Sequence, residues 1–205
     1  MKKLILSIAV LTGLAFSSQA QTEKGNFILG GVASYESVKS DATGAKAAQN
    51  LSIVPNFGYF VADNFAIGTG VGYQYSNVGS ASLTGQQETI VVNPFGRYYV
   101  SLSDKFSFFG QAQVPLAFGS VKATDANGDA GNKIGNSTYI GIALSPGFTY
   151  FPSKKLGIEF AFNGLSYNNY RVEDANNNEV KGAGNDSFAI GTNFFAPKIG
   201  VQFYF

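Results

Sequence analysis

The residue types that most often catalyse reactions or bind metals are scarce in this chain. It has 205 residues with no cysteine and no histidine. The lack of cysteine excludes disulfide bonds, thiol catalysis and thiolate metal sites. A Ser–Lys pair or two carboxylates remain possible catalytic groups, but no spacing in the sequence points to either. We therefore expect no catalytic residues and no cofactor.

Two short motifs resemble ligand-binding loops without matching their templates. The loop Asp125–Asp129 spaces its carboxylates as a calcium loop does, yet an EF-hand needs Gly at position six and Glu at position twelve. With Gly131-Asn132 beside it, a turn-rich loop tip is the simpler interpretation, and cation binding stays an alternative. The alternating glycines of Gly68–Gly72 precede no helix, which excludes a phosphate loop and fits a strand with one small face.

The composition indicates a membrane protein built from strands. Hydrophobic residues make up 45% of the chain and charged residues 13%, about half the ~25% of a typical globular protein. No apolar run approaches the roughly 20 residues of a membrane-spanning helix. Strands whose residues alternately face lipid and a polar interior would explain both the apolar composition and the lack of a long apolar run.

Residues 1–20 have the organisation of a secretory signal peptide. Lys2 and Lys3 precede the apolar run 4–16, and Ser18-Gln19-Ala20 forms a small-x-small cleavage site. We predict cleavage after Ala20 and one mature domain over 21–205. Without Lys2 and Lys3, the mature chain would have 12 Lys and Arg and 13 Asp and Glu. This near-neutral balance argues against nucleic-acid binding.

A repeated pattern organises the mature chain. Segments 54–68, 93–110 and 145–162 each contain a proline, aromatic residues, a short polar turn and a second apolar strand. A fourth copy, 196–205, stops where the turn would begin. Longer polar stretches separate the copies: 38–49, 78–87, 120–136 and 168–186. Long and short connections that alternate strictly are typical of barrels with extracellular loops and periplasmic turns.

These features predict an all-β fold, an eight-stranded antiparallel up-and-down transmembrane β-barrel. The expected strands span 25–37, 50–61, 64–77, 88–101, 105–119, 137–151, 155–167 and 187–205. Bulky apolar residues should face lipid, and small or polar residues should face the lumen. The four repeat prolines, Pro55, Pro94, Pro146 and Pro197, fall on the outer face, where we expect bulges or slack pairing.

Six polar residues are expected to face the lumen. They are Arg97, Glu159, Lys198, Gln111, Gln113 and Gln202. The interior of an eight-stranded barrel is just wide enough for its own side chains, and an unpaired buried charge costs several kcal/mol. We therefore predict a network of ion pairs and hydrogen bonds that fills the lumen, with a polar pathway or gate as the alternative.

The chain resembles the small outer-membrane-protein β-barrel family, of the porin-like OmpX and OmpA transmembrane-domain type, over residues 21–205. The most specific feature is the end of the chain, where Ile199, Val201, Phe203 and Phe205 alternate with smaller or polar residues. In that family the barrel-assembly machinery recognises such a terminal strand; an ordinary amphipathic edge strand is the alternative. The chain departs from the family in lacking tryptophan, and no peptidoglycan-binding domain is evident.

The resemblance implies an integral outer-membrane protein of a Gram-negative bacterium. The enzymes of that family use histidine as general base, and their mechanisms cannot be carried over to a chain without one. We expect a monomer in outer-membrane lipid, with a structural or surface-interaction role. Its four loops, 38–49, 78–87, 120–136 and 168–186, could contact an extracellular ligand. A narrow channel for ions or small solutes is the first alternative, and a membrane-embedded enzyme is the second.

Overall fold

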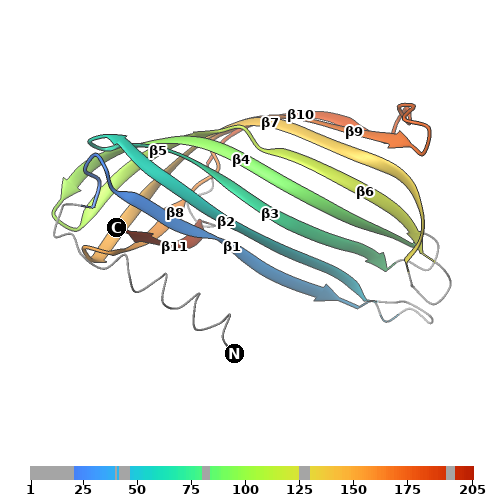
Figure 1. Ribbon diagram of the computed structural model, residues 1–205, viewed down its shortest axis with the longest axis horizontal. Coiled ribbons are helices and arrows are strands. Elements are labelled where there is room, and N and C mark those ends of the chain that lie inside the picture. The colour runs from blue at the N-terminus through green and yellow to red at the C-terminus, as the bar shows by residue number, and fades with distance from the viewer. Residues whose placement is uncertain (1–20, 40, 42–46, 80–83, 125–129, 193–196) are drawn as a thin grey trace.

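The computed structural model describes residues 21–39, 41, 47–79, 84–124, 130–192 and 197–205, and every regular element in them is a β-strand. Figure 1 shows long antiparallel strands running side by side around one interior. The eleven segments are β1 (Phe27–Val38), β2 (Ala48–Ala62), β3 (Phe65–Gly79), β4 (Thr84–Ser103), β5 (Phe106–Gln113), β6 (Leu116–Thr124), β7 (Ala130–Ser153), β8 (Leu156–Ala161), β9 (Leu165–Asp174), β10 (Asn185–Ile190) and β11 (Lys198–Tyr204). In the described part of the chain, no helix is long and apolar enough to cross a membrane.

The eleven segments make eight strands of a closed barrel, as predicted. Three of the eight strands each consist of two segments, namely β5 with β6, β8 with β9, and β10 with β11. β4 pairs with both β5 and β6, and β7 pairs with both β8 and β9. β11 pairs with β8 on one side and with β1 on the other, which closes the ring.

Closure occurs at the end of the barrel that carries the short turns, here called the turn end. β1 and β11 pair at Ile28↔Tyr204 and Leu29↔Phe203. Phe27 and Phe205 then exchange two backbone hydrogen bonds, of 2.9 and 3.0 Å. The opposite end, where β1 ends, β2 begins and the connection between β9 and β10 lies, is called the loop end (Figure 1).

The predicted strand boundaries need correction. The strands expected at 105–119 and 155–167 are interrupted at 114–115 and 162–164. In the range expected as one strand at 187–205, β10 ends at Ile190 and β11 begins at Lys198. The strands also extend into all four predicted loop ranges; β9, for example, continues to Asp174 and β4 already begins at Thr84. The physical reason is that strands continue beyond the lipid, where polar outward residues are favoured and the sequence pattern looks like a loop.

The expected slack pairing is confirmed at three of the four repeat prolines, whereas Pro197 lies just before β11 and outside any strand. Val54 and Pro55 of β2 have no paired residue in β3, although the flanking residues pair as Ile53↔Tyr73 and Asn56↔Gly70. Pro94 lies opposite the interruption between β5 and β6, and Pro146 lies opposite the one between β8 and β9. Proline has no N–H to donate, so the neighbouring strand is released at these positions.

The outer face of the wall has the predicted chemistry. Outward positions carry exposed apolar side chains on every side of the barrel, such as Ile67, Ile140 and Val201. At the turn end, outward rings contact one another, with Phe27 beside Tyr59 at 5.1 Å and Phe106 beside Tyr150 at 4.9 Å. This is the aromatic girdle expected where a barrel meets the membrane surface.

The lipid-facing wall generates the first prediction. Phe160 is paired with Phe148 and Ile199, which are both outward and apolar. Phe160→Arg should lower the free energy of unfolding by about 2–4 kcal/mol if the residue lies near the bilayer midplane. Its inward neighbour Ala161→Ser should be nearly neutral. Urea unfolding in lipid vesicles measures both, and equal costs at the two sites would contradict the assignment of faces.

Candidate functional site

A layer of aromatic side chains fills the barrel at the turn end. Phe60, Tyr99, Phe109, Phe151 and Tyr204 are all almost fully buried and form one cluster with Ile28 and Ala66. Their rings contact one another around the interior, with centroids 5.2 Å apart for Phe151 and Tyr204 and 5.9 Å apart for Tyr99 and Phe109. Each ring occupies an inward position close to a turn or to the end of the chain.

Small residues make room for these rings. A Cβ atom on Gly147 would lie 2.3 Å from the Phe109 ring, and one on Gly157 would lie 2.8 Å from the ring of Tyr204. The inward glycines here leave space for side chains from other strands, and that space is filled.

A buried ion pair lies against the aromatic layer. Arg97 on β4 and Glu159 on β8 are only 6% and 4% exposed, and Arg97 Nη1 donates to Glu159 Oε1. The two tyrosines extend this contact. Arg97 Nη1 also donates to the Tyr99 hydroxyl at 3.0 Å, and the Tyr204 hydroxyl donates to Glu159 Oε1 at 3.2 Å.

Three glutamines complete the network. Arg97 Nε donates to Gln111 Oε1 at 2.8 Å, and Gln111 Nε2 donates to Gln113 Oε1 at 2.6 Å. On the other side, Gln202 Nε2 donates to Glu159 Oε2 at 3.3 Å. The structure therefore brings together five of the six polar residues expected in the lumen. We call these five residues and the aromatic layer the plug.

The plug compensates the cost of burying two charges. A buried ion pair stabilises a protein only when further hydrogen bonds satisfy both partners, and here both groups have several. The Arg97 guanidinium also lies over the Phe109 ring, 4.3 Å from its centroid, which adds a cation–π attraction. These contacts join β4, β5, β8 and β11 across the interior.

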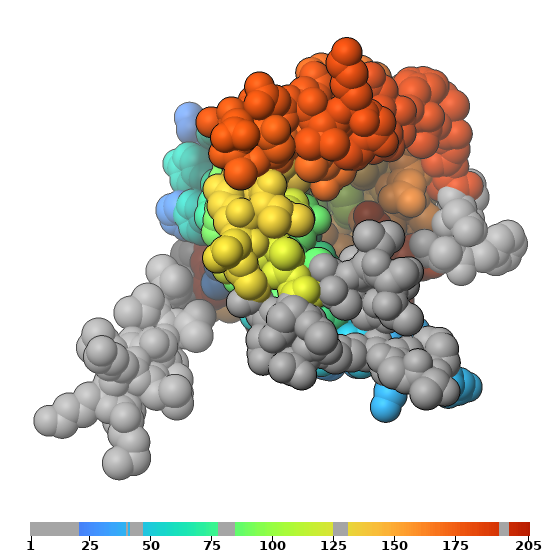
Figure 2. Space-filling model, turned by 90° about the vertical axis from the view of Figure 1, so that its right-hand side faces the viewer, coloured from blue at the N-terminus to red at the C-terminus, as the bar shows by residue number. Residues whose placement is uncertain are grey.

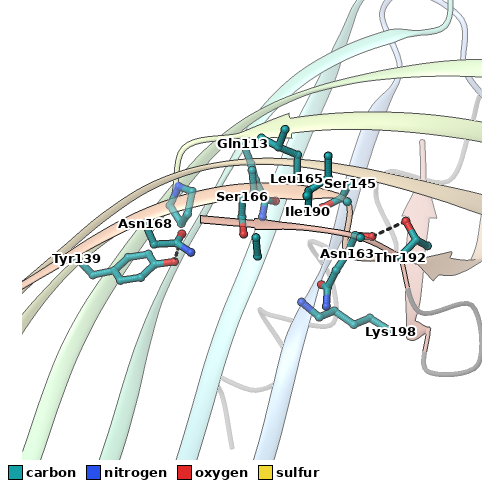
Figure 3. Close-up of a pocket in the computed structure, with 15 residues that line it drawn as sticks. Gln113, Tyr139, Ser145, Asn163, Leu165, Ser166, Asn168, Ile190, Thr192 and Lys198 are labelled. Carbon is teal, nitrogen blue, oxygen red and sulfur yellow. Dashed lines mark hydrogen bonds between the residues drawn. The ribbon is translucent and has the colours of Figure 1, made fainter. Parts of the chain in front are cut away.

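Lys198, the sixth expected residue, lies outside this network. It faces the lumen from β11, and no ion pair involving it occurs among the described residues. It lines a cavity of about 590 Å³ with residues of β7, β9 and β10 (Figure 3).

The other predicted sites are placed as follows. Ile199, Val201 and Phe203 point outward and are exposed, whereas Phe205 pairs with Phe27. The loop Asp125–Asp129 lies outside the described residues. Within the described residues, no group of three or more acidic side chains could hold a metal ion.

The sequence interpretation missed the aromatic half of the plug. Phe60, Phe109 and Phe151 occupy inward positions, where we expected small or polar residues. Their position in the sequence was the available signal. Each of these aromatic residues lies an even number of positions from other inward residues of its strand, and each lies within a few residues of a turn.

Comparison with known proteins supports the fold. No family model and no curated protein matches the sequence. The crystal structure of the outer membrane protein OprG from Pseudomonas aeruginosa matches with a TM-score of 0.50 and 15% identity, over 91% of this chain and 99% of that one. The E. coli Outer Membrane Protein W has a TM-score of 0.48 and 12% identity, over 89% and 97%.

The OprG match shows the fold alone, an outer-membrane-type β-barrel, and confirms the predicted fold class. The similarity does not single out the OmpX and OmpA type suggested by the sequence.

The plug generates the second prediction. Glu159→Gln leaves the Arg97 charge buried without its counterion, which should lower the free energy of unfolding by about 3–5 kcal/mol. The double variant Arg97→Met, Glu159→Leu should recover most of this loss. Unfolding by urea in detergent micelles measures both.

An ion pair that is much more exposed to the surroundings provides the matched control. Lys122 and Glu88 form a pair of 2.9 Å on the outer wall, and Glu88→Gln should cost less than about 1 kcal/mol. If Glu159→Gln were no more costly than Glu88→Gln, the plug would not stabilise the barrel.

Proposed function

We propose that this chain is an integral outer-membrane protein whose barrel is plugged on the periplasmic side, and that it acts through its extracellular end without catalysis. The observation that carries the proposal is the plug, in which Arg97, Glu159 and five aromatic rings fill the interior at the turn end. A lumen filled in this way favours a structural or surface-interaction role over transport.

The orientation in the membrane follows from the connections. In barrels of this type the short turns are periplasmic and the longer connections are extracellular, which supports a periplasmic position for the plug. The turns here are the two-residue connections 63–64, 104–105 and 154–155. The proposed signal peptide, residues 1–20, would direct export, and outer-membrane lipid would contact the apolar outer face.

The extracellular end offers an ordered surface for contacts with a partner. The connection between β9 and β10 stands out at the loop end (Figures 1 and 2). Arg171 pairs with Glu179 across it at 3.4 Å. The backbone N–H groups of Asn178 and Asn176 donate to the Asp174 carboxylate and hold its pKa below the ordinary value. A ligand of this end would therefore meet a hairpin with a fixed negative charge.

The narrow channel remains the second candidate, favoured by one observation. Gln202 Oε1 and Asn93 Oδ1 are buried and accept no hydrogen bond from any described residue. Such acceptors near the plug would suit water molecules, and a continuous file of water would allow conduction.

Planar-bilayer recording separates the two candidates, which is the third prediction. The purified, folded protein should show no steady conductance steps, because the plug closes its lumen. Phe109→Ala and Tyr99→Ala together should open a path and produce steps. Reproducible steps from the wild-type protein would overturn the plugged barrel and favour the channel.

The last strand generates the fourth prediction. Phe205 closes the ring with Phe27 through two backbone hydrogen bonds, and we propose that the barrel-assembly machinery also recognises this terminus. Phe205→Asp should therefore reduce the amount of folded barrel recovered in outer-membrane fractions, relative to wild type and to a control, Lys154→Gln, at a turn.

Intact mass of the recovered wild-type protein should correspond to a chain that begins at Gln21. Wild-type recovery of Phe205→Asp would contradict the recognition of this terminus, and a mass that includes residues 1–20 would contradict the signal peptide.

A further inference from the structure

A polar cup lies in the lumen on the loop side of the plug. It is the cavity of about 590 Å³ that Lys198 lines, a volume in the range of roughly 300–1,000 Å³ that is usual for small-molecule sites. Figure 3 shows its lining side chains, which come mainly from β7, β9 and β10, with Asn163 before β9, Thr192 after β10 and Lys198 from β11. Gln113, which belongs to the plug network, is also part of the lining.

Neutral hydrogen-bonding side chains make up about half of the lining of the cup, and small or apolar residues such as Leu165 and Ile190 make up most of the rest. Ser145, Ser166 and Asn163 place hydroxyl and amide groups there, and their side chains make no hydrogen bond with another described residue. Asn168 accepts a hydrogen bond from the Tyr139 hydroxyl, which fixes its position. Hydroxyl and amide groups both donate and accept, so together they suit a molecule with several hydroxyl groups.

One positive charge accompanies these groups. Lys198 is the only charged residue in the lining of the cup, which contains no carboxylate among its described residues. The inward carboxylate nearest along the paired strands is Glu159, since Lys198 lies opposite Ala161 and Gly200 opposite Glu159. Glu159 is already bound to Arg97, Gln202 and Tyr204. The ammonium group of Lys198 is therefore available to an anion.

We propose that the cup binds a small hydroxylated monocarboxylate, of the sugar-acid class, from the extracellular side. The carboxylate would pair with Lys198 Nζ, and the hydroxyl groups would bond to Asn163, Ser145 and Ser166. A single cation selects a single negative charge, and the hydroxyl and amide groups of the lining supply hydrogen-bond partners for hydroxyl groups. The proposal rests on the proposed function in one respect, because the plug forms the floor of the cup.

The test measures binding of galacturonate to the purified, folded protein by titration calorimetry in detergent micelles. Wild type should bind galacturonate more tightly than galactose, which lacks the charge, and more tightly than acetate, which lacks the hydroxyl groups. Binding should weaken as salt is added, since the ions screen Lys198. Lys198→Gln should lower the affinity roughly tenfold or more, as expected for the loss of a hydrogen bond to a charged group.

Two further variants control for charge and folding. Lys198→Arg should retain most of the affinity, and Lys122→Gln on the outer wall should leave it unchanged. An unheated sample of each variant should migrate as the folded species in a denaturing gel, which shows that the barrel is intact. Absence of binding to wild type at millimolar galacturonate, equal affinity for acetate, or unchanged affinity in Lys198→Gln would each overturn the proposal.

The two proposals fail separately. Lys198-dependent binding in a protein that conducts would retain the cup and reject the plugged barrel. A silent barrel that does not bind galacturonate would retain the plug and reject the cup.

Discussion

Backbone hydrogen bonding imposes the main constraint on this structure. A strand in lipid has no water to satisfy its N–H and C=O groups, so each must find a neighbouring strand and the sheet must close on itself. Here the closing contact is short, with two paired positions between β1 and β11 and the exchange between Phe27 and Phe205. The rest of the ring consists of longer antiparallel pairings, such as that of β3 with β4.

Closure in turn determines what the interior must contain. Every second residue points inward, and an eight-stranded ring leaves little room, so inward side chains from opposite strands must pack against one another. At the turn end this produces a buried aromatic layer with one compensated ion pair. The glycines opposite the largest rings are part of the same arrangement, since a side chain on Gly147 would clash with Phe109.

The sequence allowed prediction of the features that depend on periodicity and composition. The eight strands, the apolar outer face, the slack pairing at three of the repeat prolines and the inward direction of Arg97 and Glu159 all follow from spacing alone. The aromatic layer did not, because an inward phenylalanine such as Phe109 looks the same in sequence as one facing lipid. Interruptions such as 162–164 depend on pairing with the neighbouring strand, which local sequence does not report. Lys198 was assigned to the same network as Glu159, although two residues along β11 place it at a different level of the lumen.

That difference in level divides the interior into two environments. Near the turns, charges are paired and surrounded by rings, so the low local dielectric strengthens their attraction. Beyond Gln113 the lining mixes hydroxyl and amide groups with apolar residues, and Lys198 has no counterion among the described residues. The change coincides with the interruption at 162–164 and with the end of β10, where Gly164, Gly191 and Thr192 line the cavity. The interruption at 162–164 therefore does more than accommodate Pro146 in the wall, because it also supplies part of the surface of the cup.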